Sequence, residues 1–206
     1  MLWGLRMEIE KKRIGVDIDD TSVDFVGNYI LYFNQKYKAN LKKEDFKTCS
    51  FNKTIGGTME ESINLVNEFY KSNLFKKMFP LPNSVEIIKL LKQAGYELFV
   101  ITSRPDFLKA ETEVFIDKYF SNNFSDIFFS YNYYTKRQNG GKSKAEICLD
   151  KKISFMIDDS LEYCKQCAEK GIESLLFGNF PWNQDGEFGD KIRVKDWLKV
   201  GEKLLK

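Results

Sequence analysis

Two aspartates at the end of an apolar run have the residue types of a phosphoryl-transfer site. The segment DIDDT at residues 17–21 follows an apolar run that includes Ile14 and Val16. An aspartate can attack phosphorus to form an aspartyl-phosphate, and a neighbouring carboxylic acid can protonate the departing alcohol. A turn at the carboxyl end of a strand can bring Asp19 beside Asp17 for this purpose. The alternative is an Asp-rich turn, in which carboxylates only accept hydrogen bonds from the backbone of the turn. That alternative accounts for the residues after Asp19 but not for carboxylates that overlap the strand.

Three later segments supply what this chemistry still needs. ELFVITSRP at 97–105 is an apolar run that ends in hydroxyls, KSKAEICLD at 142–150 carries lysines where a helix is expected to begin, and ISFMIDDS at 153–160 ends in two acids. A phosphoryl group in transfer needs hydrogen-bond donors and a cation around its oxygens, and a divalent metal needs hard carboxylate ligands. Thr102, Lys144 and Asp158 fit these three needs.

In this order the four segments resemble the haloacid dehalogenase (HAD) superfamily of phosphohydrolases, whose motifs are Asp-x-Asp-x-Thr or Val, then Thr or Ser, then Lys, then a pair of acids. The resemblance extends from the first motif to the fourth, and these two motifs are the specific ones. It implies Mg²⁺ as cofactor and a role for each matching residue: Asp17 as nucleophile and metal ligand, Asp19 as acid/base and metal ligand, Thr102, Ser103 and Lys144 as phosphate ligands, and Asp158 as metal ligand.

Two assignments within this resemblance have alternatives. Lys142 stands two residues before Lys144, and both follow a Gly-Gly turn, so either could be the phosphate lysine. Asp159 is expected to act on the metal through water or through the other ligands. Asp19 argues against dehalogenation, because expelling halide requires no acid at that position.

Two local matches are similar to the 5'(3')-deoxyribonucleotidase-like branch. Asp24 and Phe25 follow the first motif as in that branch, where the aromatic residue lines the base pocket, and LLFGNFPWN at 175–183 resembles its Pro-Trp-Asn turn. Phe25 is therefore a candidate for substrate binding, with packing inside the helical segment as the alternative. Arg104 departs from the pattern of the animal enzymes, and Ser160 follows the fourth motif where Arg is expected. We consider Arg104 either a substrate ligand or the partner of a surface carboxylate.

The chain alternates between apolar strand-like runs and helical periodicity. The runs are at residues 13–19, 97–103, 127–132, 153–158 and 173–178. This alternation predicts an α/β fold, a Rossmann-like parallel sheet flanked by helices, as in the HAD fold. Ligands in such sheets bind beyond the carboxyl ends of the strands, where Asp17, Thr102 and Asp158 are expected to lie.

One long stretch has no strand pattern. Residues 24–38 and 58–75 both read as amphipathic helices, and about 55 residues are too many for a structureless loop. We predict that residues 23–78, called the helical segment below, form a small cap inserted after the first strand. Residues 1–22 and 79–206 then form the core domain.

Composition limits the remaining possibilities. The 206 residues include no histidine, which removes Ser-His and Cys-His catalysis, and the net charge of +2 gives no basic groove signal, so nucleic acid is not an expected partner. Cys164 and Cys167 form a CxxC that we assign to the core of a helix capped by Ser160. No stretch is long and apolar enough for a membrane span, and a cytoplasmic location is expected. The sequence does not determine whether the protein forms a homodimer.

Together these observations predict a Mg²⁺-dependent phosphomonoesterase that uses an aspartyl-phosphate and acts on a small phosphorylated metabolite, with a nucleoside monophosphate as the leading candidate. The alternatives are a phosphatase or phosphotransferase for sugar phosphates or other small metabolites, and a HAD-fold regulator that binds phosphate without turnover. Intact acids in both specific motifs favour an enzyme.

Overall fold

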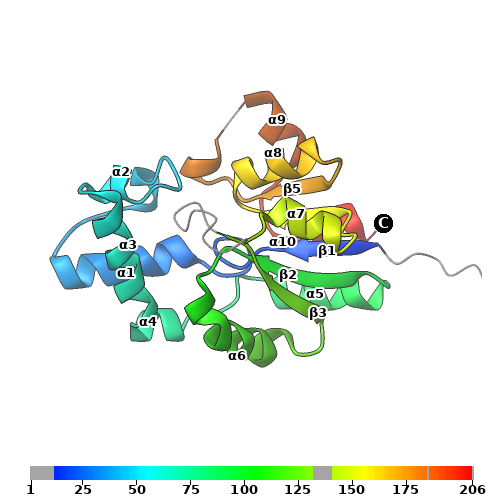
Figure 1. Ribbon diagram of the computed structural model, residues 1–206, viewed down its shortest axis with the longest axis horizontal. Helices are drawn as coiled ribbons and strands as arrows, with labels where there is room; N and C mark the ends of the chain where they lie inside the picture. The colour runs from blue at the N-terminus through cyan, green and yellow to red at the C-terminus, as the bar shows by residue number, and fades with distance from the viewer. Residues whose placement is uncertain (1–11, 132–140, 185, 206) are drawn as a thin grey trace, which may run out of the picture.

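A six-stranded parallel sheet forms the centre of the protein (Figure 1). The computed structural model describes residues 12–131, 141–184 and 186–205. The strands follow the order β3-β2-β1-β4-β5-β6 and all neighbours are parallel. Their bounds are β1 Arg13–Val16, β2 Glu97–Thr102, β3 Phe124–Phe129, β4 Phe155–Asp158, β5 Glu173–Phe177 and β6 Arg193–Val194. The order reverses between β1 and β4, which is where a sheet of this kind opens a crevice for a ligand.

Helices cover both faces of the sheet, as expected for a parallel sheet with apolar strands. Among the described residues, two clusters of buried side chains lie in the protein, one with Ile88 of α5 and Trp197 of α10, the other with Ala145 of α7 and Cys167 of α8. The helices outside the helical segment are α5 Ser84–Gln93, α6 Lys109–Phe120, α7 Lys144–Asp150, α8 Leu161–Glu169, α9 Gly186–Ile192 and α10 Trp197–Leu204, with short 3-10 turns η2 Asp106–Leu108 and η3 Pro181–Asn183.

The predicted fold class is confirmed, and four of the five predicted strands lie where expected. The third was wrong: we predicted residues 127–132, and β3 is Phe124–Phe129. This strand lies at the edge of the sheet and pairs only with β2, so Ser125 and Asp126 can be exposed and an apolar run does not mark where it begins. The two-residue strand β6 at the opposite edge was missed for the same reason.

The helical segment lies at one end of the molecule, beyond the strands (Figure 1). It contains α1 Phe25–Tyr37, η1 Lys43–Asp45, α2 Asn52–Ile55, α3 Met59–Tyr70 and α4 Asn73–Lys76. Both predicted helices are present, but the second is broken after Tyr70, because the Ser72 side chain accepts a hydrogen bond from the Phe75 N–H and starts α4. Buried aromatic residues such as Tyr29 and Phe69 belong to the same cluster as strand residues of β1 and β2, so the segment packs directly onto the rest of the protein.

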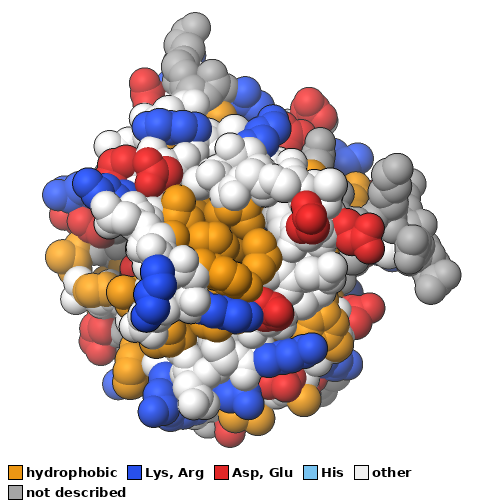
Figure 2. Space-filling view, turned by 90° about the vertical axis from the view of Figure 1, so that its left-hand side faces the viewer, with side chains coloured by type: hydrophobic (Ala, Val, Ile, Leu, Met, Phe, Trp, Pro, Cys, Tyr) orange, Lys and Arg blue, Asp and Glu red, His pale blue; other side chains and the backbone are white. Residues whose placement is uncertain are grey.

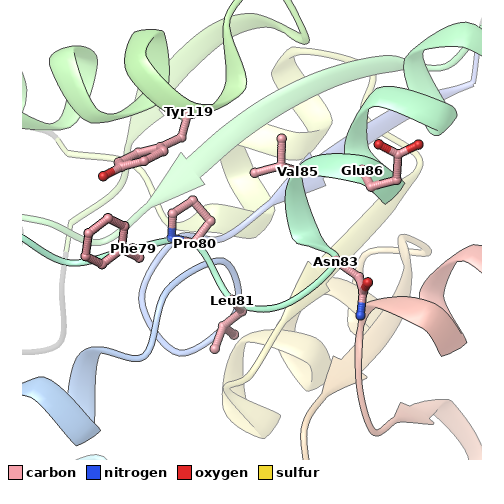
Figure 3. Close-up of a pocket in the computed structure, with 7 residues that line it drawn as sticks. All are labelled: Phe79, Pro80, Leu81, Asn83, Val85, Glu86 and Tyr119. Carbon is pink, nitrogen blue, oxygen red and sulfur yellow. The ribbon is translucent and has the colours of Figure 1, made fainter.

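The surface of the helical segment carries a group of apolar side chains bordered by charged ones (Figure 2). A separate open hollow is lined by residues after the segment and by Tyr119 of α6 (Figure 3). Its lining residues are Phe79, Pro80, Leu81, Asn83, Val85, Glu86 and Tyr119, none of which is a candidate catalytic residue. No helix in the described part of the chain is long and apolar enough to span a membrane.

Candidate active site

Three carboxylates converge where β1 and β4 end. Asp17 follows β1, its N–H donating to the Ile157 carbonyl oxygen at 3.0 Å, and Asp158 is the last residue of β4. One carboxylate oxygen from each of Asp17, Asp158 and Asp159 lies within 4.8 Å of the others, and all three residues are buried. The point at which the strand order reverses therefore holds a compact group of hard oxygen ligands.

A single buried ammonium group joins two of these carboxylates. Lys144 Nζ lies 2.9 Å from Asp17 Oδ1 and 2.7 Å from Asp158 Oδ2, and the side chain is 1% exposed. Lys144 is the first residue of α7, whose start is fixed by the Ser143 side chain. The structure thus places Lys144 in the site, whereas Lys142 is exposed and pairs with Asp150.

The electrostatics of this cluster favour a bound cation. Burial, only partly offset by Lys144, raises the pKa of Asp17 to about 7, and the negative charge of Asp158 contributes to the rise. Burial followed by the charge of Asp158 also raises the pKa of Asp159 well above its usual range. One ammonium does not balance three buried carboxylates, and an all-oxygen donor set without histidine or thiolate fits Mg²⁺. The residues present therefore suit the metal that the sequence predicts.

Asp19 is held by Arg104 instead of joining the cluster. Arg104 Nε donates to Asp19 Oδ2 at 2.9 Å and Nη2 donates to Oδ1 at 2.7 Å, a two-point contact that fixes the carboxylate plane. The guanidinium also donates to Thr112 Oγ1 at 3.3 Å and lies over the Phe75 ring of the helical segment at 5.1 Å. The structure thus places Arg104 against the predicted acid/base, which is a site residue and not the surface carboxylate of the alternative prediction. This partnership was missed because the two residues are 85 positions apart in sequence.

The hydroxyls after β2 lie at the same edge of the sheet. Thr102 is 1% exposed, and its Oγ1 accepts a hydrogen bond from the Arg104 N–H at 3.2 Å. Ser103 Oγ lies 2.9 Å from Ser130 Oγ and donates to the Tyr163 hydroxyl at 3.2 Å. The centroid of the Tyr163 ring also lies 4.5 Å from Lys144 Nζ, a contact that was not predicted. Tyr163 therefore contacts both Ser103 and Lys144, and the phosphate-binding roles of Thr102 and Ser103 stay predictions.

Phe25 lies in the interior of the helical segment. It is 6% exposed, and the rings of Phe51, Phe69 and Tyr70 surround it at centroid distances of 6.3, 5.3 and 5.9 Å. This packing leaves little of the ring for a ligand. The geometry favours the alternative of a packed aromatic residue, and base stacking by Phe25 stays a prediction.

The acidic residues between β1 and α1 divide into chemical and structural roles. Asp20 has a positive φ of 54°, and its carboxylate accepts hydrogen bonds from the Val26 N–H at 3.1 and 3.2 Å, which satisfies the start of α1. Asp24 accepts from the Gly27 N–H at 3.0 Å in the same helical turn. Turn and capping chemistry thus explains Asp20 and Asp24, and leaves Asp17 and Asp19 for the site.

The Pro-Trp-Asn turn touches the site, which the sequence did not indicate. Asn183 closes the loop, its Nδ2 donating to the carbonyl oxygens of Asp159 and Phe177, both at 3.0 Å. Trp182, however, donates its indole N–H to Asp159 Oδ2 at 2.7 Å. The aromatic residue next to Asn183 is therefore part of the surroundings of the carboxylate cluster.

A parallel sheet with this strand order, an aspartate pair after β1, a buried lysine and paired acids at the end of β4 define a HAD-superfamily phosphatase. Solved structures agree on the fold: a haloacid dehalogenase-like hydrolase from Streptococcus pneumoniae matches with a TM-score of 0.69 at 13% identity, over 94% of this chain and 98% of the other. A HAD-hydrolase from Bacillus subtilis, solved bound to magnesium, matches with a TM-score of 0.61 at 14% identity, over 94% and 98% of the chains.

A comparison of the sequence with models of protein families identifies the family of this protein. The model of the "5' nucleotidase, deoxy (Pyrimidine), cytosolic type C protein" family matches residues 11–139, more than half of the chain, and the protein belongs to that family. A 5'(3')-deoxyribonucleotidase from Bacillus subtilis is 27% identical over 95% of this chain and 99% of its own length.

Proposed function

We propose that this protein is a magnesium-dependent 5'-nucleotidase of the cytoplasm that hydrolyses (deoxy)nucleoside monophosphates through an aspartyl-phosphate on Asp17. The observation that carries the proposal is the convergence of three buried carboxylates and one buried ammonium at the carboxyl ends of β1 and β4. Membership of the deoxynucleotidase family supports the substrate class.

Asp17 and Asp158 would hold Mg²⁺ directly, with Asp159 binding it directly or through water. The Asp19 carboxylate is engaged by Arg104, and the part of Asp19 as a metal ligand, which the family resemblance implies, stays a prediction. A bound Mg²⁺ would neutralise negative charge on the carboxylates and on the phosphoryl oxygens. The same charge balance would keep Asp17 ionised at neutral pH.

The two chemical steps use Asp17 and Asp19. Lys144 binds Asp17 Oδ1, so Oδ2 is the oxygen that attacks phosphorus. The new bond joins Asp17 to phosphorus, the bond between phosphorus and the ester oxygen breaks, and Asp19 gives a proton to the departing alcohol. Water then attacks the phosphoenzyme, Asp19 takes the proton of that water, and phosphate leaves Asp17. Thr102, Ser103 and Lys144 would bind the transferring oxygens through these steps.

A substrate screen tests the proposal. Phosphate release from deoxynucleoside monophosphates, ribonucleoside monophosphates and sugar phosphates is measured with Mg²⁺ present, and the nucleotides are expected to give the highest kcat/KM. Asp17→Asn should abolish turnover because an amide cannot form the acyl phosphate. With a substrate whose leaving group departs without protonation, Asp19→Asn should leave detectable phosphoenzyme that breaks down slowly, because activation of water is lost, and mass spectrometry of the acid-quenched protein detects it. Near wild-type phosphate release by Asp17→Asn would contradict the mechanism, and a preference for sugar phosphates would contradict the substrate assignment.

A further inference from the structure

Trp182 links the carboxylate cluster to the helical segment. On one side its indole N–H donates to Asp159 Oδ2 at 2.7 Å. On the other side its ring is stacked on Phe180, with centroids 4.5 Å apart and an interplanar angle of 7°. The ammonium of Lys43, from the 3-10 turn η1, lies 5.0 Å from the Phe180 ring centroid and 5.9 Å from that of Trp182. A chain of contacts therefore runs from the helical segment to Asp159.

The backbone that carries Trp182 is fixed by its neighbour. Asn183 is fully buried and its Oδ1 accepts hydrogen bonds from the Phe180 N–H at 3.0 Å and from Arg193 Nη1 at 2.8 Å. Together with the two carbonyls bound by its Nδ2, these contacts hold the turn Pro181–Asn183 in one conformation. The indole consequently approaches Asp159 from a rigid support, as a group that orients a ligand must.

Within the described part of the chain, Asp159 is held less closely than Asp158. The hydrogen bond recorded there for its Oδ1 is a long one from the Thr21 hydroxyl, at 3.5 Å, whereas Asp158 is held both by Lys144 and by the Ser160 N–H at 2.9 Å. With Oδ2 committed to the indole, Oδ1 is the oxygen free of a short hydrogen bond. Loss of the indole N–H would leave the carboxylate able to rotate away from the other two acids.

We propose that Trp182 is a positioning residue of the metal site: its indole N–H holds the Asp159 carboxylate towards Asp17 and Asp158, and the Lys43 ammonium holds the indole from the helical segment. This inference rests on the proposed metal site. According to this inference, Trp182 and Lys43, which lie outside the four motifs, contribute to metal affinity. The position of η1, which carries Lys43, would then affect that affinity.

The first test is Trp182→Phe, which keeps an aromatic ring on Phe180 and removes the N–H donor. The readout is the dissociation constant for Mn²⁺, measured on the purified protein from the electron paramagnetic resonance signal of the free ion. Loss of a group that orients a metal ligand typically weakens affinity about 10- to 100-fold, and we expect a change of that size. Trp197→Phe is the matched control, because Trp197 also donates its indole N–H, at 2.8 Å, but to the Thr21 carbonyl oxygen. Its Mn²⁺ affinity should stay within about twofold of wild type on the same reasoning.

The second test, Lys43→Gln, separates positioning from simple charge. Lys43 is partly exposed and close enough to lower the pKa of Asp20, so removing its charge would on electrostatic grounds strengthen cation binding. Positioning predicts the opposite, a weaker Mn²⁺ affinity. In the Trp182→Phe background the Lys43 change should cause no further weakening, because the hydrogen bond that it supports is already absent.

The outcomes separate this inference from the proposed function. If the wild type and Asp158→Asn bind Mn²⁺ equally, or neither binds it, the metal site itself is wrong. If the wild type binds and Asp158→Asn does not, but Trp182→Phe matches the wild type while circular dichroism shows it folded, the positioning role is overturned and the metal site stands. Tighter binding by Lys43→Gln would overturn the part assigned to Lys43.

Discussion

Replacing Phe25 by alanine separates a packing role from a base-binding role. The side chain is 6% exposed and three aromatic rings lie within 6.3 Å of its centroid. Truncating a buried phenylalanine costs about 3 to 5 kcal/mol. For a protein of this size one kcal/mol corresponds to about 2 to 4 °C, so the melting temperature should fall by about 6 to 20 °C. Because the packing geometry predicts this loss, we expect a large destabilisation whatever the substrate.

The kinetic consequence is measured on the same variant with two substrates, a deoxynucleoside monophosphate and a small aliphatic phosphate ester. Stacking of a base on an aromatic ring is worth about 1 to 3 kcal/mol, or roughly tenfold to a hundredfold in affinity. If Phe25 only packs, the Michaelis constants of both substrates should change by similar factors, at a temperature where the variant is folded. Phe25→Leu, which keeps most of the volume, should recover most of the stability. An increase confined to the nucleotide, with little change in melting temperature, would refute the packing argument and establish stacking.

Three further changes probe the site. Arg104→Lys keeps the charge but loses the two-point contact with Asp19. It should lower kcat by roughly a hundredfold with an unchanged KM, since a small misplacement of a reacting group has that effect. A raised KM at constant kcat would instead identify Arg104 as a substrate ligand. Lys144→Met should lower kcat by about 100- to 1000-fold, whereas Lys142→Met, at a surface position, should leave activity and melting temperature nearly unchanged. Removal of metal with EDTA should abolish activity. Addition of Mg²⁺ at about 100 times its Kd should restore the activity and stabilise the fold by about 2.7 kcal/mol. Full activity after exhaustive chelation would exclude the metal site.

The predictable parts of the fold are those in which burial or hydrogen bonding restricts the residue types that a segment can contain. Strands buried on both faces, such as residues 97–102, must be almost continuously apolar, and helix starts need a side chain like that of Ser143 or Ser160. Edge strands lack the first constraint. The boundaries of β3 were therefore misplaced, and β6, with two residues, carries no period at all.

The sequence could propose site residues but not their partnerships. It predicted Asp17, Thr102 and Asp158, and left Lys142 and Lys144 open, because each of these residue types stands at the end of a strand or near the start of a helix. Which lysine enters the site depends on how α7 packs against β4, and this is a tertiary property. The pairing of Asp19 with Arg104 is likewise invisible in a linear pattern, since neither residue type demands the other.

Contacts among the described residues join the helical segment to the site, and they limit how the segment can act. Asp20 binds the first turn of α1 three residues after Asp17, Phe75 lies under the guanidinium that holds Asp19, and Lys43 lies over the rings of Phe180 and Trp182, the latter bonded to Asp159. Each contact is one step from a group with a proposed chemical role. A displacement of the segment would therefore disturb the acid/base and the metal cluster together, because both depend on side chains that the segment supports. With the proposed roles of these groups, variants in the segment are expected to change metal affinity and kcat as well as substrate preference, and all three should be measured.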